Sequence, residues 1–202
     1  MSAKSVRLFP GLLSCRAPFV EPPQTDHELP AVRITLPSGR TVISDDDSAD
    51  RLLSAHFVRE VRLGRAAPDD FTIDQYHPDV ANVDPGGHRD TVVEQKLGAA
   101  FFKQAEMDSP LAEGSFKDLF PMSVMTTSTL NRLNELRPAS RFDVRRFRMN
   151  LVVKSAIAGF AENEWVGSQM QVGDSVRLIV ALPDPRCVMT TLPQDDLPKD
   201  TE

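Results

Sequence analysis

The sequence predicts a mainly β protein with a few helices, an α+β fold whose strands form a barrel-like or twisted antiparallel core. Three observations predict it. The sixteen prolines among 202 residues exceed the usual share of about 5% and break up long helices. Most apolar runs are short and end at a turn, and helical spacing is limited to two or three segments. Apolar residues make up 41% of the chain, enough for a core.

The first half of the chain is expected to contain a hairpin, a helix, a strand and a long loop. Apolar residues alternate over 30–43, PAVRITLPSGRTVI, on both sides of a Pro-Ser-Gly turn, which predicts the hairpin. Helical spacing predicts a helix near 48–57, and a strand is expected at 58–63. Residues 64–90 are rich in Asp, Pro and Gly, which predicts a loop that is either a surface excursion or faces a substrate.

The second half of the chain has a clearer pattern. A capped helix is expected to follow Thr126-Thr127-Ser128 and to end before Pro138. Strands are expected over 144–153, 169–172 and 176–182, the last two joined by a Gly-Asp turn. The segment after them is rich in turn-forming residues and ends in charge.

Composition excludes several functional classes. The net charge of −6 argues against a broad electrostatic grip on nucleic acid or on a membrane surface. The two cysteines are too few for a zinc ribbon or an iron–sulfur box, and the four histidines lack HExxH spacing. Nucleotide-binding glycine motifs and the GxSxG motif are absent. No apolar run approaches the about 20 residues of a membrane span, so we expect a cytoplasmic protein.

Donor side chains recur in the strand expected over 144–153. Because side chains alternate along a strand, Arg146, Arg148 and Asn150 would share one face. Two guanidiniums and an amide in a row suit a phosphate or a polar heterocycle. The alternative is a solvated strand face that pairs with carboxylates such as Asp143.

Two further positions could carry chemistry. The helix start at Thr126 and Thr127 could bind an anion through free backbone N–H groups, or these residues could simply cap the helix. Cys187 follows a strand on a turn, where the neighbouring Arg186 would favour the reactive thiolate. The alternative is that Cys187 is a small buried hydrophobic residue. Cys15 follows an apolar run and is assigned to packing.

Three segments in this order resemble the MOSC family, the β-barrel domains related to the C-terminal part of molybdenum cofactor sulfurase. They are SRFDVRRFRMNLVV at 140–153, GFAENEWVGSQMQVGDSVRLIV at 159–180 and PRCVMTT at 185–191. Two upstream segments, at 2–13 and 29–42, are similar to the N-terminal β-barrel region that accompanies this domain. The nearest members are prokaryotic relatives of the mitochondrial amidoxime-reducing component.

The resemblance implies a domain organisation and an incomplete chain. It places a partial N-terminal β-barrel region at 1–103, including the loop 64–90, and a MOSC domain at 104–202. Family members carry a further cofactor-contacting strand before the first of these regions. They also continue with further helix and barrel strands beyond the metal cysteine, so the chain is expected to be truncated at both ends.

The resemblance also implies a molybdopterin site in which a cysteine thiolate binds molybdenum. Cys187 falls on the position of the metal ligand. Arg148 and Asn150 fall on positions that hold the pterin, with Arg146 flanking them, and small polar residues at the helix start lie against the cofactor. The residues expected to bind the cofactor are Thr126, Thr127, Arg146, Arg148, Asn150 and Arg186.

The implied activity is a two-electron reduction of small N-hydroxylated substrates, from N–OH to N–H plus water. A separate redox protein would supply the electrons, because the chain has no ferredoxin-like cysteine box. One alternative is a sulfur or cofactor carrier that uses a persulfide on Cys187. The other is an inactive truncated fragment.

Overall fold

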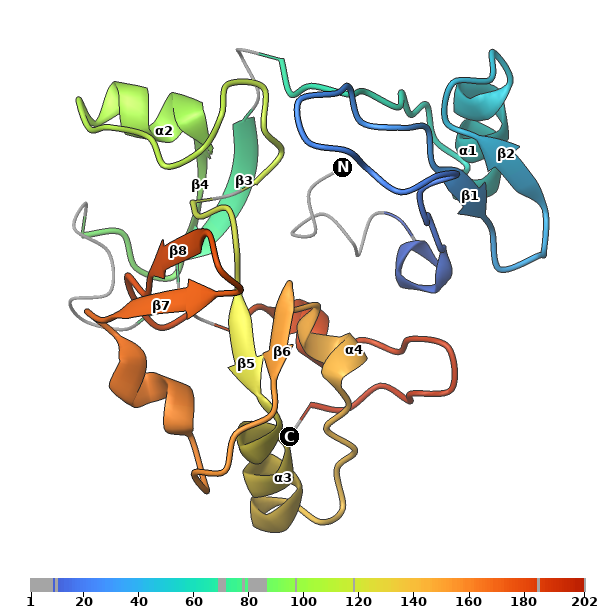
Figure 1. The fold of residues 1–202 in the computed structure, drawn as a ribbon. Helices are drawn as coiled ribbons and strands as arrows, with labels where there is room; N and C mark the ends of the chain where they lie inside the picture. Colours follow the sequence, from blue (N-terminus) through green and yellow to red (C-terminus); the bar gives the residue numbers. More distant parts are fainter. Residues whose placement is uncertain are drawn as a thin grey trace. The chain divides into compact units, whose positions relative to one another are not determined.

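The computed structural model describes residues 9, 11–68, 72–77, 79, 87–96, 98–117, 119–184 and 186–201. The chain divides into two compact units, Met1–Phe120 and Pro121–Glu202. Every sheet in the described part of the chain has two strands (Figure 1). Short, mostly antiparallel strand pairs are interspersed with a few helices, so the α+β class is confirmed. Among the described residues no sheet closes on itself, so the expected barrel is not seen there.

The N-terminal unit contains the expected hairpin. A short 3-10 helix, η2 (Leu12–Ser14), precedes it. Strand β1 (Arg33–Thr35) pairs antiparallel with β2 (Thr41–Ile43). The N–H of Gly39 donates to the carbonyl of Leu36 at 2.9 Å and closes the turn. Gly39 has a φ of +83°, which glycine adopts without strain, and the predicted hairpin is confirmed.

Helix α1 (Ala49–Phe57) follows the hairpin and confirms the predicted helix. It ends at Val58, whose φ of 51° is left-handed. The strand expected at 58–63 is wrong, because these residues form a turn and an irregular segment. The hydroxyl of Ser54 bonds to both the N–H and the carbonyl of Val61, at 3.0 and 3.2 Å, so a side chain satisfies the backbone groups that a strand would pair.

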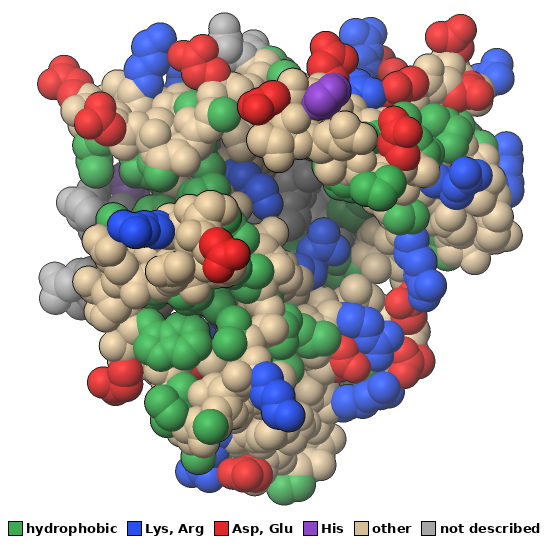
Figure 2. Space-filling view, viewed as in Figure 1, with side chains coloured by type: hydrophobic (Ala, Val, Ile, Leu, Met, Phe, Trp, Pro, Cys, Tyr) green, Lys and Arg blue, Asp and Glu red, His purple; other side chains and the backbone are tan. Residues whose placement is uncertain are grey.

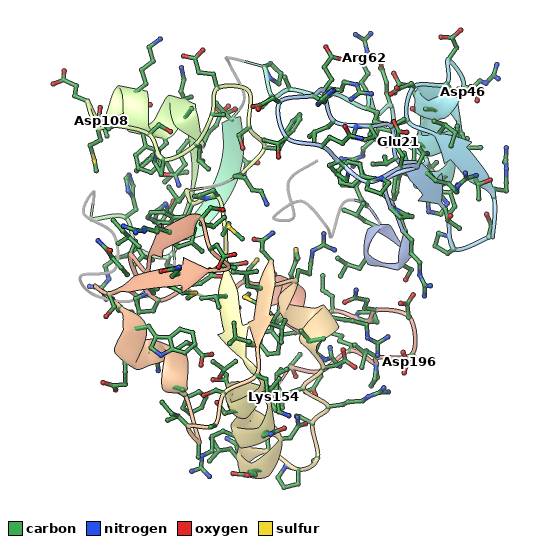
Figure 3. The ribbon with its side chains drawn as sticks, viewed as in Figure 1. Glu21, Asp46, Arg62, Asp108, Lys154 and Asp196 are labelled. Atoms are coloured by element: carbon green, nitrogen blue, oxygen red, sulfur yellow. The ribbon has the colours of Figure 1, made fainter. Side chains whose placement is uncertain are left out.

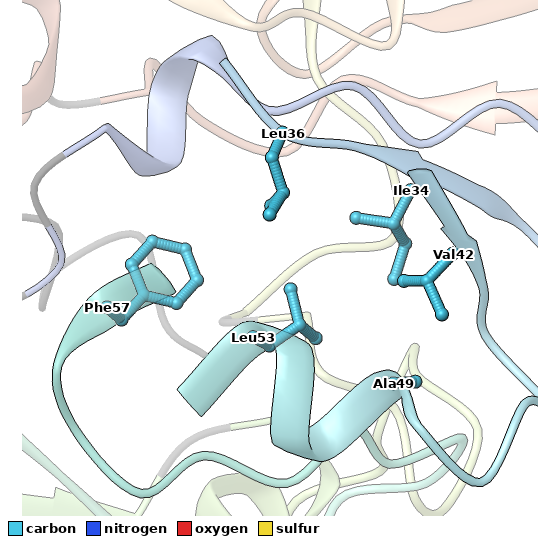
Figure 4. Close-up of a cluster of buried hydrophobic side chains, with 6 residues drawn as sticks. All are labelled: Ile34, Leu36, Val42, Ala49, Leu53 and Phe57. Carbon is cyan, nitrogen blue, oxygen red and sulfur yellow. The ribbon is translucent and has the colours of Figure 1, made fainter. Parts of the chain in front are cut away.

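The hairpin and α1 share one apolar core (Figure 4). Alternate residues of the hairpin face residues of the helix that recur every four positions, which is the periodicity of a buried helix face. The core residues are Ile34, Leu36, Val42, Ala49, Leu53 and Phe57. Cys15 packs against this core, as expected from its position after an apolar run.

A second antiparallel pair follows in the same unit. Strand β3 (Thr72–His77) pairs over its full length with β4 (Thr91–Lys96), and α2 (Ala99–Gln104) comes next. The loop expected over 64–90 is therefore wrong where β3 lies. Its polar residues hid the strand, and the strand forms because β4 supplies a partner later in the chain. Residues 69–71, 78 and 80–86 of that segment lie outside the described residues.

The C-terminal unit begins with a parallel pair. Strand β5 (Val124–Thr126) lies beside β6 (Leu151–Val153). Helix α3 (Thr127–Leu136) starts at the end of β5 and stops before Pro138, so the predicted capped helix is confirmed (Figure 1). Because the helix follows the strand directly, the last residue of β5 and the first residues of α3 lie next to one another.

The strand expected over 144–153 is wrong in its first half. Residues Val144–Phe147 form the short helix α4, which Asp143 caps by accepting the N–H of Arg145 at 3.0 Å. Arg148 ends the helix with a left-handed φ of 53°. The alternation of apolar and basic residues resembles a strand, but the cap and the contacts of Arg146 described below select a helix.

The last elements surround a hairpin. A 3-10 helix, η3 (Ala161–Trp165), precedes β7 (Gln169–Val172), which has the expected bounds. Strand β8 (Val176–Ile179) pairs antiparallel with β7 and is shorter than expected. The 3-10 helix η4 (Val188–Thr191) follows. None of the helices among the described residues is long and apolar enough to cross a membrane.

Candidate functional site

Cys187 lies at the start of η4 and is exposed. Its carbonyl accepts hydrogen bonds from both the backbone N–H and the hydroxyl of Thr190, each at 3.1 Å. The hydroxyl of Thr191 donates to the carbonyl of Val188 at 2.7 Å. The backbone of the turn is thus closed on itself while the residue stays open to solvent, and the alternative of a buried Cys187 is wrong.

The buried side chain of Arg146, on α4, donates hydrogen bonds to the backbone of this turn. It is 4% exposed, and its Nη1 donates to the carbonyls of Thr190 and Leu192 at 3.2 and 3.3 Å. Its Nε donates to the carbonyl of Arg141 at 2.9 Å and its Nη2 to that of Pro198 at 2.8 Å. The side chain of Arg146 therefore points into the protein, and four of the five N–H donors of its guanidinium are used by the chain itself.

Arg186 contacts α4 on the other side of Cys187. Its guanidinium lies 5.7 Å from the ring centre of Phe147, within range of a cation–π interaction. The same guanidinium donates to the carbonyl of Asp184 and pairs with the Asp184 carboxylate at 3.1 Å. Two consecutive residues of α4, Arg146 and Phe147, therefore contact the chain before and after Cys187.

An ion-pair cluster lies beside α4. Arg145 pairs with Asp143 at 2.9 Å and with Asp196 at 2.7 Å, and Arg141 pairs with Asp196 at 2.8 Å. The hydrogen bonds from Arg145 lower the pKa of Asp143 and of Asp196 to about 2. Figure 2 shows acidic and basic side chains interleaved there, where Figure 3 labels Asp196. Asp143 thus has an arginine partner, as the alternative interpretation expected. That partner is Arg145, which is not one of the residues predicted to share a strand face.

Arg148 and Asn150 keep free donors. The backbone N–H of the exposed Arg148 donates to the carbonyl of Val144 at 3.3 Å, but its guanidinium makes no hydrogen bond or ion pair with the residues that the structure describes. Asn150 accepts the N–H and the hydroxyl of Ser123 on its Oδ1, at 3.0 and 3.1 Å, which anchors the start of the β5–β6 pair. Its Nδ2 group makes no hydrogen bond within the described part of the chain. The expectation that these two residues and Arg146 share one strand face is wrong, because a helix and a left-handed residue separate them.

Thr126 caps α3, so the capping interpretation is confirmed. Its hydroxyl accepts the N–H of Thr129 at 3.2 Å and donates to the Glu162 carboxylate at 2.7 Å. Thr126 is 0% exposed, whereas Thr127 beside it is half-buried. Burial raises the pKa of Glu162, but the hydrogen bonds from Thr126 and Thr129 outweigh it and hold that pKa below its usual value.

Sequence analysis missed Glu162, which joins η3 to the start of α3 through Thr126. The signal that could have found it is its place as the first residue of the ENEW segment, which contributed to the family resemblance. It also missed the Asp196 contacts, because no local pattern shows that the C-terminal segment reaches α4. Within the described ranges, no group of three or more His, Cys, Asp or Glu residues is placed to hold a metal ion.

Comparison with known families gives a match in the C-terminal part of the chain. The family model described as MOSC domain matches residues 112–202. Comparison with curated proteins and with solved structures finds no significant match. The expected boundary between 103 and 104, and the N-terminal region assigned before it, stay predictions. The matched residues include α3, α4 and the Cys187 turn, so this part of the chain is similar to the MOSC domain.

Proposed function

We propose that the chain binds the molybdenum cofactor and reduces N-hydroxylated compounds, with Cys187 as the metal ligand. The observation that carries this proposal is an exposed thiol on a turn fixed against α4, within the residues matched by the MOSC domain. The free donors of Arg148 follow directly after α4. The proposed site therefore combines a soft ligand with nearby cationic donors.

The donor set fits the chemistry of the group. A thiolate suits a metal that already carries sulfur ligands, as molybdenum does in molybdopterin. Arg148 and the Nδ2 group of Asn150 are proposed to donate to the pterin or its phosphate, with Thr127 and Arg186 contributing at the edges. Thr126 is fully buried, so its contribution is to fix the start of α3. When bound, the cofactor supplies two-electron redox chemistry at the metal.

The proposed reaction is a two-electron reduction of the N–O bond. The N–O bond breaks, two electrons and two protons are taken up, and the products are the N–H compound and water. A separate redox protein delivers the electrons, since the chain itself holds no iron–sulfur motif. The exposed turn lets solvent supply protons and lets a small substrate approach.

The test is the molybdenum and pterin content of protein purified from a host that makes the cofactor. We expect nearly stoichiometric molybdenum in the unmodified chain and in Cys15→Ala, and its loss in Cys187→Ala. Cys15→Ala is the matched control because Cys15 packs against the apolar core of the other unit. Molybdenum retained in Cys187→Ala, or absent from all three proteins, would overturn the proposal. Absence together with no rise in melting temperature on adding cofactor favours an inactive domain.

A persulfide carrier is the second candidate, and the exposure of Cys187 also favours it. Such a protein passes a sulfur atom on without reducing a substrate. Intact-mass measurement of the native protein distinguishes the two, because a persulfide adds about 32 Da to Cys187 and is removed by a reductant. An adduct on Cys187 without molybdenum supports the carrier over the oxidoreductase.

A further inference from the structure

Arg146 is an unusual residue for its surroundings. Its side chain is 4% exposed, and among the described residues its guanidinium has no carboxylate partner. Burying a charge is costly unless hydrogen bonds replace the lost water. Here four bonds to backbone carbonyls replace it, and each of these carbonyls belongs to a non-helical or 3-10 segment.

The carbonyls bound by Arg146 come from three places in the chain. Arg141 precedes α4, Thr190 and Leu192 lie in and just after η4, and Pro198 lies in the C-terminal segment. One side chain therefore joins three segments that are distant in sequence. The backbone hydrogen bond from the N–H of Asp200 to the carbonyl of Thr191, at 2.9 Å, joins two of these segments, whereas Arg146 joins all three.

The link from Arg146 to Cys187 has two steps. Arg146 Nη1 donates to the Thr190 carbonyl at 3.2 Å, and Thr190 in turn donates its N–H and its hydroxyl to the Cys187 carbonyl. A guanidinium is planar and rigid, so it fixes the directions of the carbonyls that it binds. The orientation of the Cys187 turn therefore depends on the place of Arg146 in α4.

The other attachments of the turn are weaker. The stack of Arg186 on Phe147 involves partly exposed side chains, and the ion pairs of Asp196 are exposed. Exposed ion pairs contribute little to stability. Leu197, at 1% exposed, anchors the segment beyond η4 but makes no polar contact with the turn.

We propose that Arg146 is a positioning residue that fixes the turn presenting Cys187, and that it acts through this turn without contacting a ligand. The identity of the group that Cys187 binds rests on the proposed function, but the positioning does not. Removal of the guanidinium releases the turn while α3 keeps its own cap and hydrogen bonds.

The test places a nitroxide spin label on Cys187 in a Cys15→Ala background, so that the label has one site. We expect a restricted label with unmodified Arg146, a mobile label in Arg146→Met and an intermediate one in Arg146→Lys, which keeps the charge but has fewer donors. Arg145→Met is the matched control: it removes the adjacent guanidinium and its partly exposed ion pairs with Asp143 and Asp196, and the label is expected to stay restricted.

Hydrogen exchange on the unlabelled variants separates positioning from general loss of stability. In Arg146→Met we expect the amides of Thr190, Leu192 and Asp200 to exchange about tenfold faster or more, since their acceptors lie in the released turn, and those of α3 to change little. A restricted label in folded Arg146→Met, or equal acceleration in α3 and the turn, overturns the proposal. If Arg146→Met does not fold, Arg146→Lys decides, and a label as restricted as with Arg146 overturns it.

The outcome does not depend on molybdenum. A fixed turn in a protein that binds no molybdenum would overturn only the proposed function. A molybdenum-binding protein whose label stays restricted in Arg146→Met would overturn only the positioning role.

Discussion

Different forces stabilise the region around α1 and the region around α4. The buried side chains around α1 are apolar and come from a hairpin and one face of a helix. Around α3 and α4 the buried set includes polar and charged side chains, namely Thr126, Ser128, Thr129, Ser140 and Arg146. Apolar packing is non-directional, whereas hydrogen bonds fix directions. The second arrangement fixes the directions of the groups that it joins, including the turn that begins at Cys187.

The two cysteines illustrate the same difference. The Cys15 thiol donates to the carbonyl of Gly11 at 3.5 Å, and burial raises its pKa. This favours the unreactive protonated thiol. Cys187 is exposed on a turn whose backbone is held by Arg146 through Thr190. Of the two, Cys187 is the more accessible to an external ligand.

The largest loss of stability is expected from a substitution in the apolar core around α1. Leu53 is 6% exposed in the core, so Leu53→Ala should cost about 3 kcal/mol through lost burial and a residual cavity. Hydrogen exchange should show the loss in α1, with the amide of Thr190 unchanged. Equal acceleration at both places would contradict the view that the two regions are held together separately.

A smaller effect should follow from the polar region. Thr126→Val removes the cap of α3 and the hydrogen bond to Glu162, and we expect a loss of about 1 to 2 kcal/mol. Urea unfolding followed by the fluorescence of Trp165, in the same 3-10 helix as Glu162, measures it. Thr127→Val is the control, because the Thr127 hydroxyl has no hydrogen bond within the described part of the chain. A cost as large in the control would show that the cap is not the cause.

Acid should weaken the polar region next. The pKa values of Asp143 and Asp196 are lowered to about 2, and that of Glu162 is lowered too. A lowered carboxyl pKa stabilises the fold above the unfolded pKa of about 4, and this contribution is lost as pH falls from about 4 towards 2. Asp196 is exposed, whereas Asp143 and Glu162 are half-buried, and solvent screening should keep the loss modest. Trp165 fluorescence in urea at several pH values measures it, and the Asp143→Asn, Asp196→Asn double variant should flatten the dependence. An unchanged slope in that variant would contradict the assignment.

The smallest effect is expected for an exposed pair. Arg132 and Glu135 pair at 3.1 Å on the surface of α3, with side chains 45% and 65% exposed. Arg132→Ala should change stability by less than about 0.5 kcal/mol. A loss comparable to that of Thr126→Val would show that surface charge matters more in this unit than burial and direction.

The sequence predicted those elements whose structure depends on residues close together in the chain. The hairpin at 30–43 has its turn residues, α1 has its helical spacing, and α3 has its cap and its closing proline. These features are set by residues a few positions apart, so a single sequence reveals them.

The elements that depend on distant partners were not predictable in this way. Strand β3 has polar residues and forms against β4. Helix α4 has the alternation of a strand, yet Arg146 binds carbonyls at Thr190, Leu192 and Pro198, which no local window contains. The exposure of Cys187 followed from its place on a turn, but what fixes that turn could be seen only in the fold.

The most direct measurement of the central claim is X-ray absorption at the molybdenum edge of protein purified with its cofactor. The account predicts that molybdenum in the unmodified chain and in Cys15→Ala has one more sulfur neighbour than molybdenum in Cys187→Ala loaded with added cofactor. An equal number of sulfur neighbours in all three proteins would contradict it.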